Sequence, residues 1–121
     1  VTFDFDDTLT MPRWDEEEEL WMGGTAPNKK TISAMKKFAS KGYEVKIVTS
    51  RHGTDEHKKM VANFAKKHNL PVKDIIFTNG KYKADTLERI GSVLHYDDDT
   101  EEISRIKSKG IKVIHIKHPL D

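Results

Sequence analysis

The sequence predicts an α/β fold, a three-layer sandwich in which helices cover both faces of a five-stranded parallel sheet. Short apolar runs typical of buried strands alternate with stretches that have helical spacing, and the turns between them are short. Strands and helices in strict alternation favour parallel pairing through right-handed crossovers. Since 121 residues are enough to bury one core, we expect a single domain over residues 1–121.

The predicted strands are short and recur along the whole chain. In the first strand Val1, Phe3 and Phe5 alternate with polar residues. The other four strands follow from apolar runs at 45–48, 75–77, 92–96 and 112–116.

Helices are predicted between these strands. Two apolar stripes indicate the longer helices: Ile32, Met35, Phe38 and Ala39, then Met60, Val61, Phe64, Ala65 and His68. Thr54 is the predicted N-cap of the second helix, while Gly42 and Gly110 are predicted to end helices. Shorter helices fit residues 84–90 and 100–109.

The segment at about 10–27 shows no persistent strand or helix pattern. We expect a short, flap-like excursion over one edge of the sheet and no large cap. Its four glutamates at 16–19 are typical of a solvated surface. Trp14 and Trp21 are expected to pack within this excursion, although such rings can also stack on a nucleic-acid base.

Composition excludes several classes of protein. The formal net charge is +1, so no overall field favours nucleic acid or a membrane surface. The absence of cysteine excludes disulfides, thiolate zinc sites and cysteine nucleophiles, and it fits a reducing compartment. No apolar stretch approaches the ~18 residues of a membrane span. We therefore expect a cytoplasmic protein with no membrane partner.

Chemically active residues gather where the predicted strands end. The first strand ends in Asp4, Asp6 and Asp7, and the second in Thr49-Ser50-Arg51. Lys81 and Lys83 follow the third strand, and the acidic run Asp97-Asp98-Asp99 ends the fourth. Because ligands of open parallel sheets bind at the carboxyl ends of the strands, this pattern predicts a site for phosphate and a metal ion.

The stretches DFDDTLT, IVTSR, KYKAD and LHYDDD resemble, in order, the four motifs of the haloacid dehalogenase superfamily. The resemblance covers nearly the whole chain. It implies a Rossmann-like sheet with the first strand central and the second and fourth beside it, and a phosphatase of the capless type. A more distant similarity is to the 3′-phosphatase domains of polynucleotide kinases, which usually carry Gly where this chain has Asp7 and Ser50.

The resemblance also implies roles for individual residues. Asp4 corresponds to the nucleophile that forms an aspartyl-phosphate, and Asp6 to the general acid and base. Thr49 corresponds to the hydroxyl that binds phosphoryl oxygens. Lys83 is the preferred counterpart of the motif-three cation, and Lys81 is the alternative.

The resemblance implies that a Mg²⁺ ion is bound by Asp4, by the main-chain carbonyl of Asp6, and by Asp97 and Asp98. It does not indicate which of Asp97 and Asp98 is the direct ligand. Such an ion offsets the mutual repulsion of these carboxylates. Thr8, Ser50 and Arg51 are the predicted substrate-binding residues, Arg51 as a bidentate phosphate donor. Asp7 is expected to serve a turn, and Asp99 to cap the helix that begins at Thr100.

We therefore expect a Mg²⁺-dependent phosphomonoester hydrolase. Its substrate is predicted to be a nucleotide, another phosphorylated small molecule or the phosphorylated end of a nucleic acid, and no oligomeric state is predicted. One alternative is a phosphoacceptor receiver domain, but its acceptor Asp should end the third strand, where Phe77-Thr78-Asn79 stands. A catalytically silent binding module on the same fold is the other.

Overall fold

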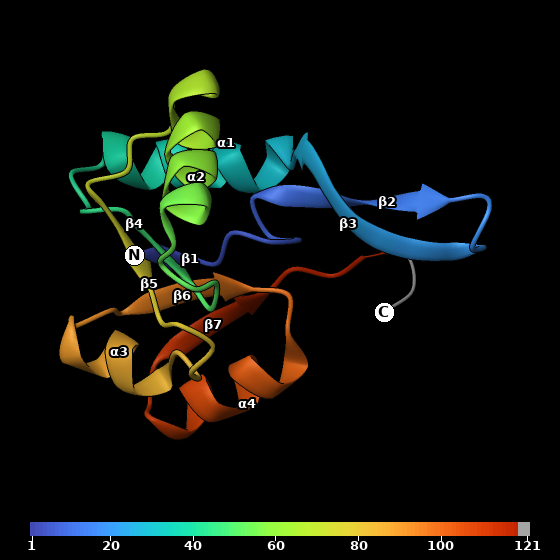
Figure 1. Cartoon of the computed structure of the whole chain (residues 1–121). Helices are drawn as coiled ribbons and strands as arrows, with labels where there is room; N and C mark the ends of the chain where they lie inside the picture. Colours follow the sequence, from blue (N-terminus) through green and yellow to red (C-terminus); the bar gives the residue numbers. More distant parts are fainter. Residues whose placement is uncertain (119–121) are drawn as a thin grey trace.

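The computed structural model describes residues 1–118 and has the predicted α/β fold, with five parallel strands in one sheet (Figure 1). These strands are β1 (Thr2–Phe3), β4 (Lys46–Thr49), β5 (Asp74–Phe77), β6 (Leu94–Asp97) and β7 (Lys112–His115). Their order is β5-β4-β1-β6-β7, and every neighbouring pair is parallel. The first strand is therefore central, between the second and fourth strands of the sheet, as predicted.

Helices cover both faces of this sheet. Figure 1 shows α1 (Lys29–Ser40) and α2 (Asp55–Lys67) on one face, and α3 (Ala84–Arg89) and α4 (Thr100–Ser108) on the other. Two buried apolar clusters fill the interfaces. Because side chains alternate along a strand, Ile47 packs with residues of α1 and α2, and its neighbour Val48 packs with residues of α3 and α4.

The predicted helix boundaries are confirmed at their caps. Thr54 Oγ1 accepts a hydrogen bond from the N–H of His57 at 3.1 Å, and Asp99 accepts from two N–H groups in the first turn of α4, at 2.8 and 3.1 Å. Gly42 and Gly110 follow α1 and α4 with φ of 91° and 78°, a conformation that glycine adopts without strain. No helix within residues 1–118 is long and apolar enough to cross a membrane.

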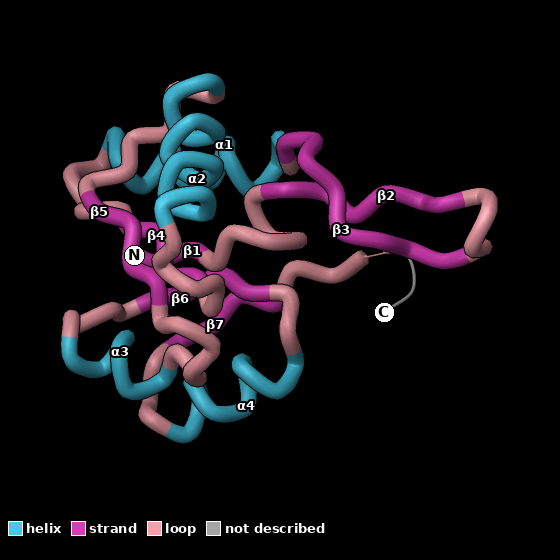
Figure 2. Tube along the Cα trace, viewed as in Figure 1, coloured by secondary structure: helices cyan, strands magenta, loops and turns pink. Residues whose placement is uncertain are grey.

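The segment from 10 to 27, in which we predicted no strands, is a β-hairpin. Strands β2 (Thr10–Asp15) and β3 (Leu20–Pro27) form a separate antiparallel sheet, in which Trp14 pairs with Trp21. The hairpin projects from the body (Figures 1 and 2), and we call residues 10–27 the arm. Most of its residues are exposed or only half-buried, so neither face of the hairpin packs on a core. Without a buried face, the sequence does not alternate between apolar and polar residues, which is the pattern that predicts a strand.

Glycine has one clear structural role in the arm. A Cβ atom on Gly24 would lie 2.2 Å from the carbonyl oxygen of Met11, whereas a Cβ atom on Gly23 would meet nothing within 4 Å. The close approach falls where the register of β2 and β3 shifts, between Met11 and Arg13. The two strands can therefore pass this irregularity only because residue 24 has no side chain.

Candidate functional site

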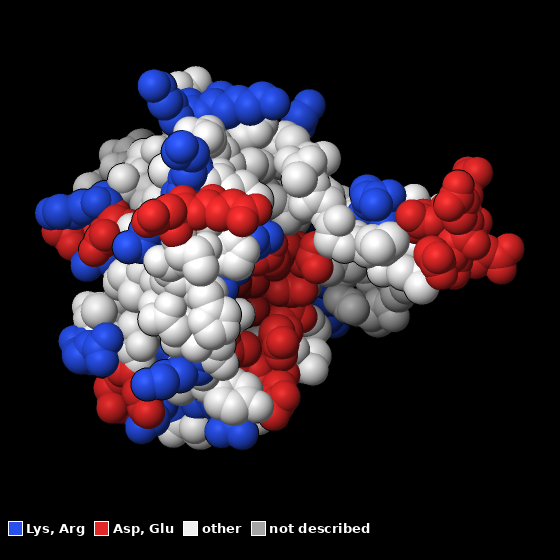
Figure 3. Space-filling model, viewed as in Figure 1, with Lys and Arg blue, Asp and Glu red and all other residues white. Residues whose placement is uncertain are grey.

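Three aspartates from two strand ends meet at the carboxyl edge of the sheet. Asp4 follows β1, Asp97 ends β6, and Asp98 comes next; one oxygen from each lies within 4.8 Å of the others. Asp4 and Asp97 are buried, and Asp98 is half-buried. Figure 3 shows an acidic surface between the body and the base of the arm. Carboxylate oxygens are ligands that hard divalent cations prefer, so this donor set fits a metal ion such as Mg²⁺.

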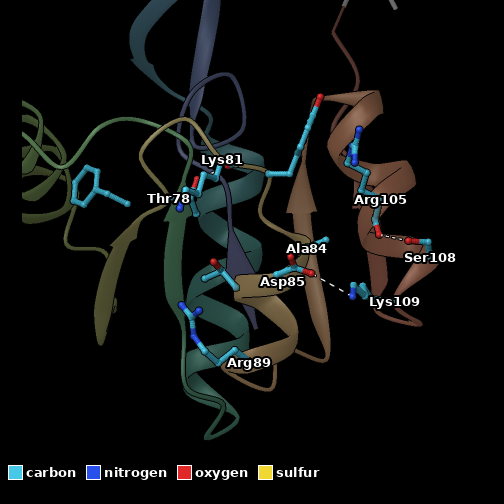
Figure 4. Close-up of a pocket in the computed structure, with 11 residues that line it drawn as sticks. Thr78, Lys81, Ala84, Asp85, Arg89, Arg105, Ser108 and Lys109 are labelled. Carbon is cyan, nitrogen blue, oxygen red and sulfur yellow. Dashed lines mark hydrogen bonds and ion pairs between the residues drawn. The ribbon is translucent and has the colours of Figure 1, made fainter.

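A buried lysine bridges two of these aspartates. Lys83, at the start of α3, places its Nζ 2.8 Å from Asp4 Oδ1 and 2.8 Å from Asp97 Oδ2, and its side chain is 2% exposed. Lys81, the alternative motif-three residue, is exposed and lines a pocket between α3 and α4 with Arg89 (Figure 4). The structure therefore brings Lys83, and not Lys81, to the acidic cluster.

Two groups that the sequence analysis did not single out complete the surroundings of Lys83. Glu102 of α4 is buried; its Oε1 accepts from the backbone N–H of Lys83 at 3.0 Å, and its Oε2 lies 3.5 Å from Lys83 Nζ. His95 is fully buried, with Nε2 2.8 Å from Asp97 Oδ2 and Nδ1 2.8 Å from the hydroxyl of Thr2. The spacing of His95 and Asp97 in β6 was the available signal, since residues two apart share a face of a strand.

These contacts shift the ionisation of the cluster in different directions. Burial raises the pKa of Asp4 well above its usual range, despite the nearby charge of Lys83. Burial would also raise the pKa of Asp97, but the hydrogen bond from His95 and the charge of Lys83 outweigh it and hold this pKa at about 2. Burial raises the pKa of Asp98 and lowers that of His95, so the imidazole is neutral at pH 7.

The balance of charge favours a further cation. The ammonium group of Lys83 contacts Asp4, Asp97 and Glu102, and Asp98 lies beside Asp4 and Asp97. Burial by itself would lower the pKa of Lys83, but the charges of Asp4 and Asp97 outweigh it and raise that pKa. Four carboxylates around one positive charge leave the site strongly negative when all are ionised. A divalent cation among Asp4, Asp97 and Asp98 offsets much of that charge.

Of three further predicted site residues, Thr8 contacts the cluster, whereas Thr49 and Ser50 bond to other groups. Thr8 is buried, and its hydroxyl donates to Asp4 Oδ2 at 3.2 Å and to Asp98 Oδ1 at 3.4 Å. Thr49 ends β4 beside β1; its hydroxyl accepts from the N–H of Arg51 at 3.3 Å. Ser50 is exposed, and its carbonyl oxygen accepts from the N–H of Gly80 at 2.7 Å.

Asp6 and Arg51 form a pair of their own. Arg51 donates from Nε to Asp6 Oδ2 at 2.7 Å and from Nη2 to Asp6 Oδ1 at 2.8 Å. Arg51, the predicted hydrogen-bond donor to phosphate, is therefore bonded to Asp6, the predicted general acid and base. Asp7 has φ of 58°, and its N–H donates to the hydroxyl of Thr10 at 2.9 Å, in agreement with its expected role in a turn.

Comparison with known protein families finds no family model that matches this chain. A search of curated proteins finds no match either. What the fold and the site define is thus an α/β protein with a Rossmann-like parallel sheet and a buried aspartate cluster that can hold a metal ion.

Proposed function

We propose that this protein is a Mg²⁺-dependent phosphomonoester hydrolase of the haloacid dehalogenase type, with Asp4 as the nucleophile. One observation carries the proposal: the buried ammonium of Lys83 lies between Asp4 and Asp97, and Asp98 has an oxygen close to these two carboxylates. A carboxylate nucleophile, a fixed cation and an acidic cation site are the components that phosphoryl transfer to a carboxylate requires.

Asp4 is oriented for attack by two donors. Lys83 holds Asp4 Oδ1, and the hydroxyl of Thr8 holds Oδ2. In the first step an oxygen of Asp4 forms a bond to phosphorus while the bond from phosphorus to the ester oxygen breaks. The leaving oxygen takes a proton from Asp6. In the second step Asp6 accepts a proton from water, and the water oxygen forms a bond to phosphorus while the bond from phosphorus to the Asp4 oxygen breaks, which releases inorganic phosphate and regenerates the Asp4 carboxylate.

The remaining residues orient and neutralise the phosphoryl group. Lys83 offsets negative charge on Asp4 and on the phosphoryl oxygens, and its burial strengthens that interaction because water does not screen it. Arg51 fixes the carboxyl group of Asp6 through two hydrogen bonds. The hydroxyl groups of Thr49 and Ser50 are proposed donors to phosphoryl oxygens.

Mg²⁺ fits the carboxylates present and would be held by Asp4, by Asp97 or Asp98, and by the main-chain carbonyl of Asp6. When bound, this ion supplies charge neutralisation for the transferring phosphoryl group. Asp97 already accepts hydrogen bonds from Lys83, His95 and the N–H of Asp99. Asp98 lacks these donors, so we propose Asp98 as the direct ligand and Asp97 as the residue that holds Lys83.

The proposed substrate is a phosphorylated small molecule such as a nucleotide, with a nucleic-acid end as the second candidate. The arm carries five acidic residues and one Arg and joins the body next to the site. This charge repels a long polyanion more strongly than a small phosphomonoester, which favours the nucleotide.

A screen of phosphomonoesters with Mg²⁺ tests the proposal, and it should include nucleotides and oligonucleotides with 3′- or 5′-phosphate. Wild type should release inorganic phosphate from at least one of them. Asp4→Asn should show no turnover above background, because an amide does not attack phosphorus. Lys81→Ala, outside the cluster, is the control variant and should keep most of the activity.

The same screen separates the two alternatives. A binding module without catalysis should retain a phosphorylated ligand without hydrolysing it. A receiver-type domain should incorporate phosphate from a small phosphodonor and keep it. Phosphate release by Asp4→Asn at a rate comparable to that of wild type would show that Asp4 is not the nucleophile.

A further inference from the structure

The arm separates charge and apolar surface from the rest of the molecule. Residues 10–27 carry a net charge of −4. Since the whole chain has a formal charge of +1, the residues outside the arm carry +5. Among residues 1–118 eight large apolar side chains are exposed, and four belong to the arm: Met11, Trp14, Leu20 and Met22. An isolated two-stranded hairpin is marginally stable in water, and exposed apolar side chains of this kind favour association.

The surface that complements the arm is α1. This helix contains four lysines at positions 29, 30, 36 and 37 and no acidic residue, and Lys41 follows it. Lys36 and Lys37 are exposed and form no ion pair within residues 1–118. The helices α2, α3 and α4, by contrast, each contain at least two acidic residues or an acidic first turn. Among the helices within residues 1–118, α1 is therefore the one that carries lysines and no acidic residue.

The directions of the arm and α1 would also allow the arm of one copy to lie along α1 of a second copy. β3 ends at Pro27 and α1 begins at Lys29, and from this junction the two elements extend in opposite directions (Figures 1 and 2). A two-fold axis near the junction therefore lays each arm along α1 of the other copy. Eight residues of strand span roughly 26 Å, and Lys36 and Lys37 lie roughly 11 Å along α1, so an axis roughly 7 Å from the junction on the side of the arm sets the acidic tip at 16–19 beside these lysines.

We infer that this protein associates as a two-fold dimer in which the arm of each copy lies on α1 of its partner. In that arrangement Glu17 and Glu18 at the tip face Lys36 and Lys37, while the exposed side chains of Leu20 and Met22, which share one face of the arm, lose contact with water. Such an interface is isologous and closes on itself, so association stops at the dimer. This inference does not depend on the proposed activity.

Charge reversal followed by sedimentation analysis tests the dimer. Wild type should sediment as a dimer at low ionic strength and dissociate as salt is added. Glu17→Lys with Glu18→Lys, and separately Lys36→Glu with Lys37→Glu, should each raise the dissociation constant at least about tenfold. Lys66→Glu with Lys67→Glu is the matched control, since it reverses the same charges in the last turn of α2, and it should leave the dimer intact.

Mixing the two reversed variants gives the decisive result. One variant then has a basic tip and a basic α1, and the other an acidic tip and an acidic α1, so both contacts are complementary only in the mixed dimer. Each variant alone should be monomeric, and the mixture should be dimeric. Wild type that stays monomeric at low salt, or a mixture that does not associate, overturns the inference and leaves the arm to a different partner.

Discussion

Lys83 is the residue on which the electrostatics of the candidate site depend most. Its ammonium is the only positive charge among the buried carboxylates Asp4, Asp97 and Glu102 in the described part of the chain. Removing one partner of a buried ion pair costs more than the pair contributes, because the other charge stays buried without compensation. Lys83 therefore serves folding and the proposed chemistry together.

Lys83→Ala should accordingly lower both stability and activity. We expect the free energy of unfolding to fall by about 3 kcal/mol or more, because Asp4 and Asp97 lose their shared cation. Turnover should fall by about 10²–10³-fold, as for other fixed donors to a transition state. Urea denaturation and phosphate release measure the two effects, and Lys81→Ala is the control. Equal losses for the two variants would contradict the assignment of Lys83 to the site.

At the scale of elements, the arm behaves as a unit separate from the body. β2 and β3 make their extensive contacts with each other, and both tryptophans of the chain, Trp14 and Trp21, belong to this hairpin. Their rings are in edge-to-face contact with centroids 5.6 Å apart. Tryptophan fluorescence therefore reports the arm alone, whereas far-UV circular dichroism reports mainly the helices of the body.

Gly24→Ala should disrupt the arm and leave the body folded. The added methyl group would lie 2.2 Å from the carbonyl oxygen of Met11, so the backbone of β2 or β3 must move. We expect tryptophan emission to shift to longer wavelength, while the melt followed by circular dichroism stays close to that of wild type. Gly23→Ala adds the same methyl group into open space and should change neither signal. Unchanged tryptophan emission in Gly24→Ala would show that the hairpin does not need this close approach.

At the scale of the whole molecule, the metal site links stability to Mg²⁺. The aspartates of the cluster come from β1 and β6, which are joined only when the sheet forms, so the unfolded chain lacks the site. A ligand that binds the folded state alone stabilises it in proportion to the logarithm of its concentration. Mg²⁺ should thus act on the cooperative unfolding of the body.

Thermal melts with chelator and with increasing Mg²⁺ measure this link. At a Mg²⁺ concentration about a hundred times the dissociation constant, the melting temperature of wild type should rise by roughly 10 °C. Asp98→Asn should melt at or above wild type in chelator, because it removes a repelling charge, and should gain little from Mg²⁺. Asp97→Asn should melt below wild type in chelator, since Asp97 accepts hydrogen bonds from Lys83 and His95. A wild-type melting temperature that Mg²⁺ leaves unchanged would exclude the metal site.

The sequence by itself determined the fold class, the order of the elements and most of the acidic cluster. Strand and helix patterns are local, and the first and fourth predicted strands both end in aspartates, so the carboxyl edge of the sheet could be predicted to unite Asp4, Asp97 and Asp98. The cap at Thr54 could be recognised for the same reason, since its partner is three residues away.

Only the tertiary structure decided which side chains form hydrogen bonds and ion pairs with one another. Lys83 reaches Asp4 across 79 positions of the chain, and Arg51 reaches Asp6 across 45; such pairings depend on how the strands and loops pack. Glu102 has the sequence signature of an exposed first-turn acid, and burial under Lys83 changes its role. The arm escaped prediction for the opposite reason: it packs on no core, so no apolar period marks its strands.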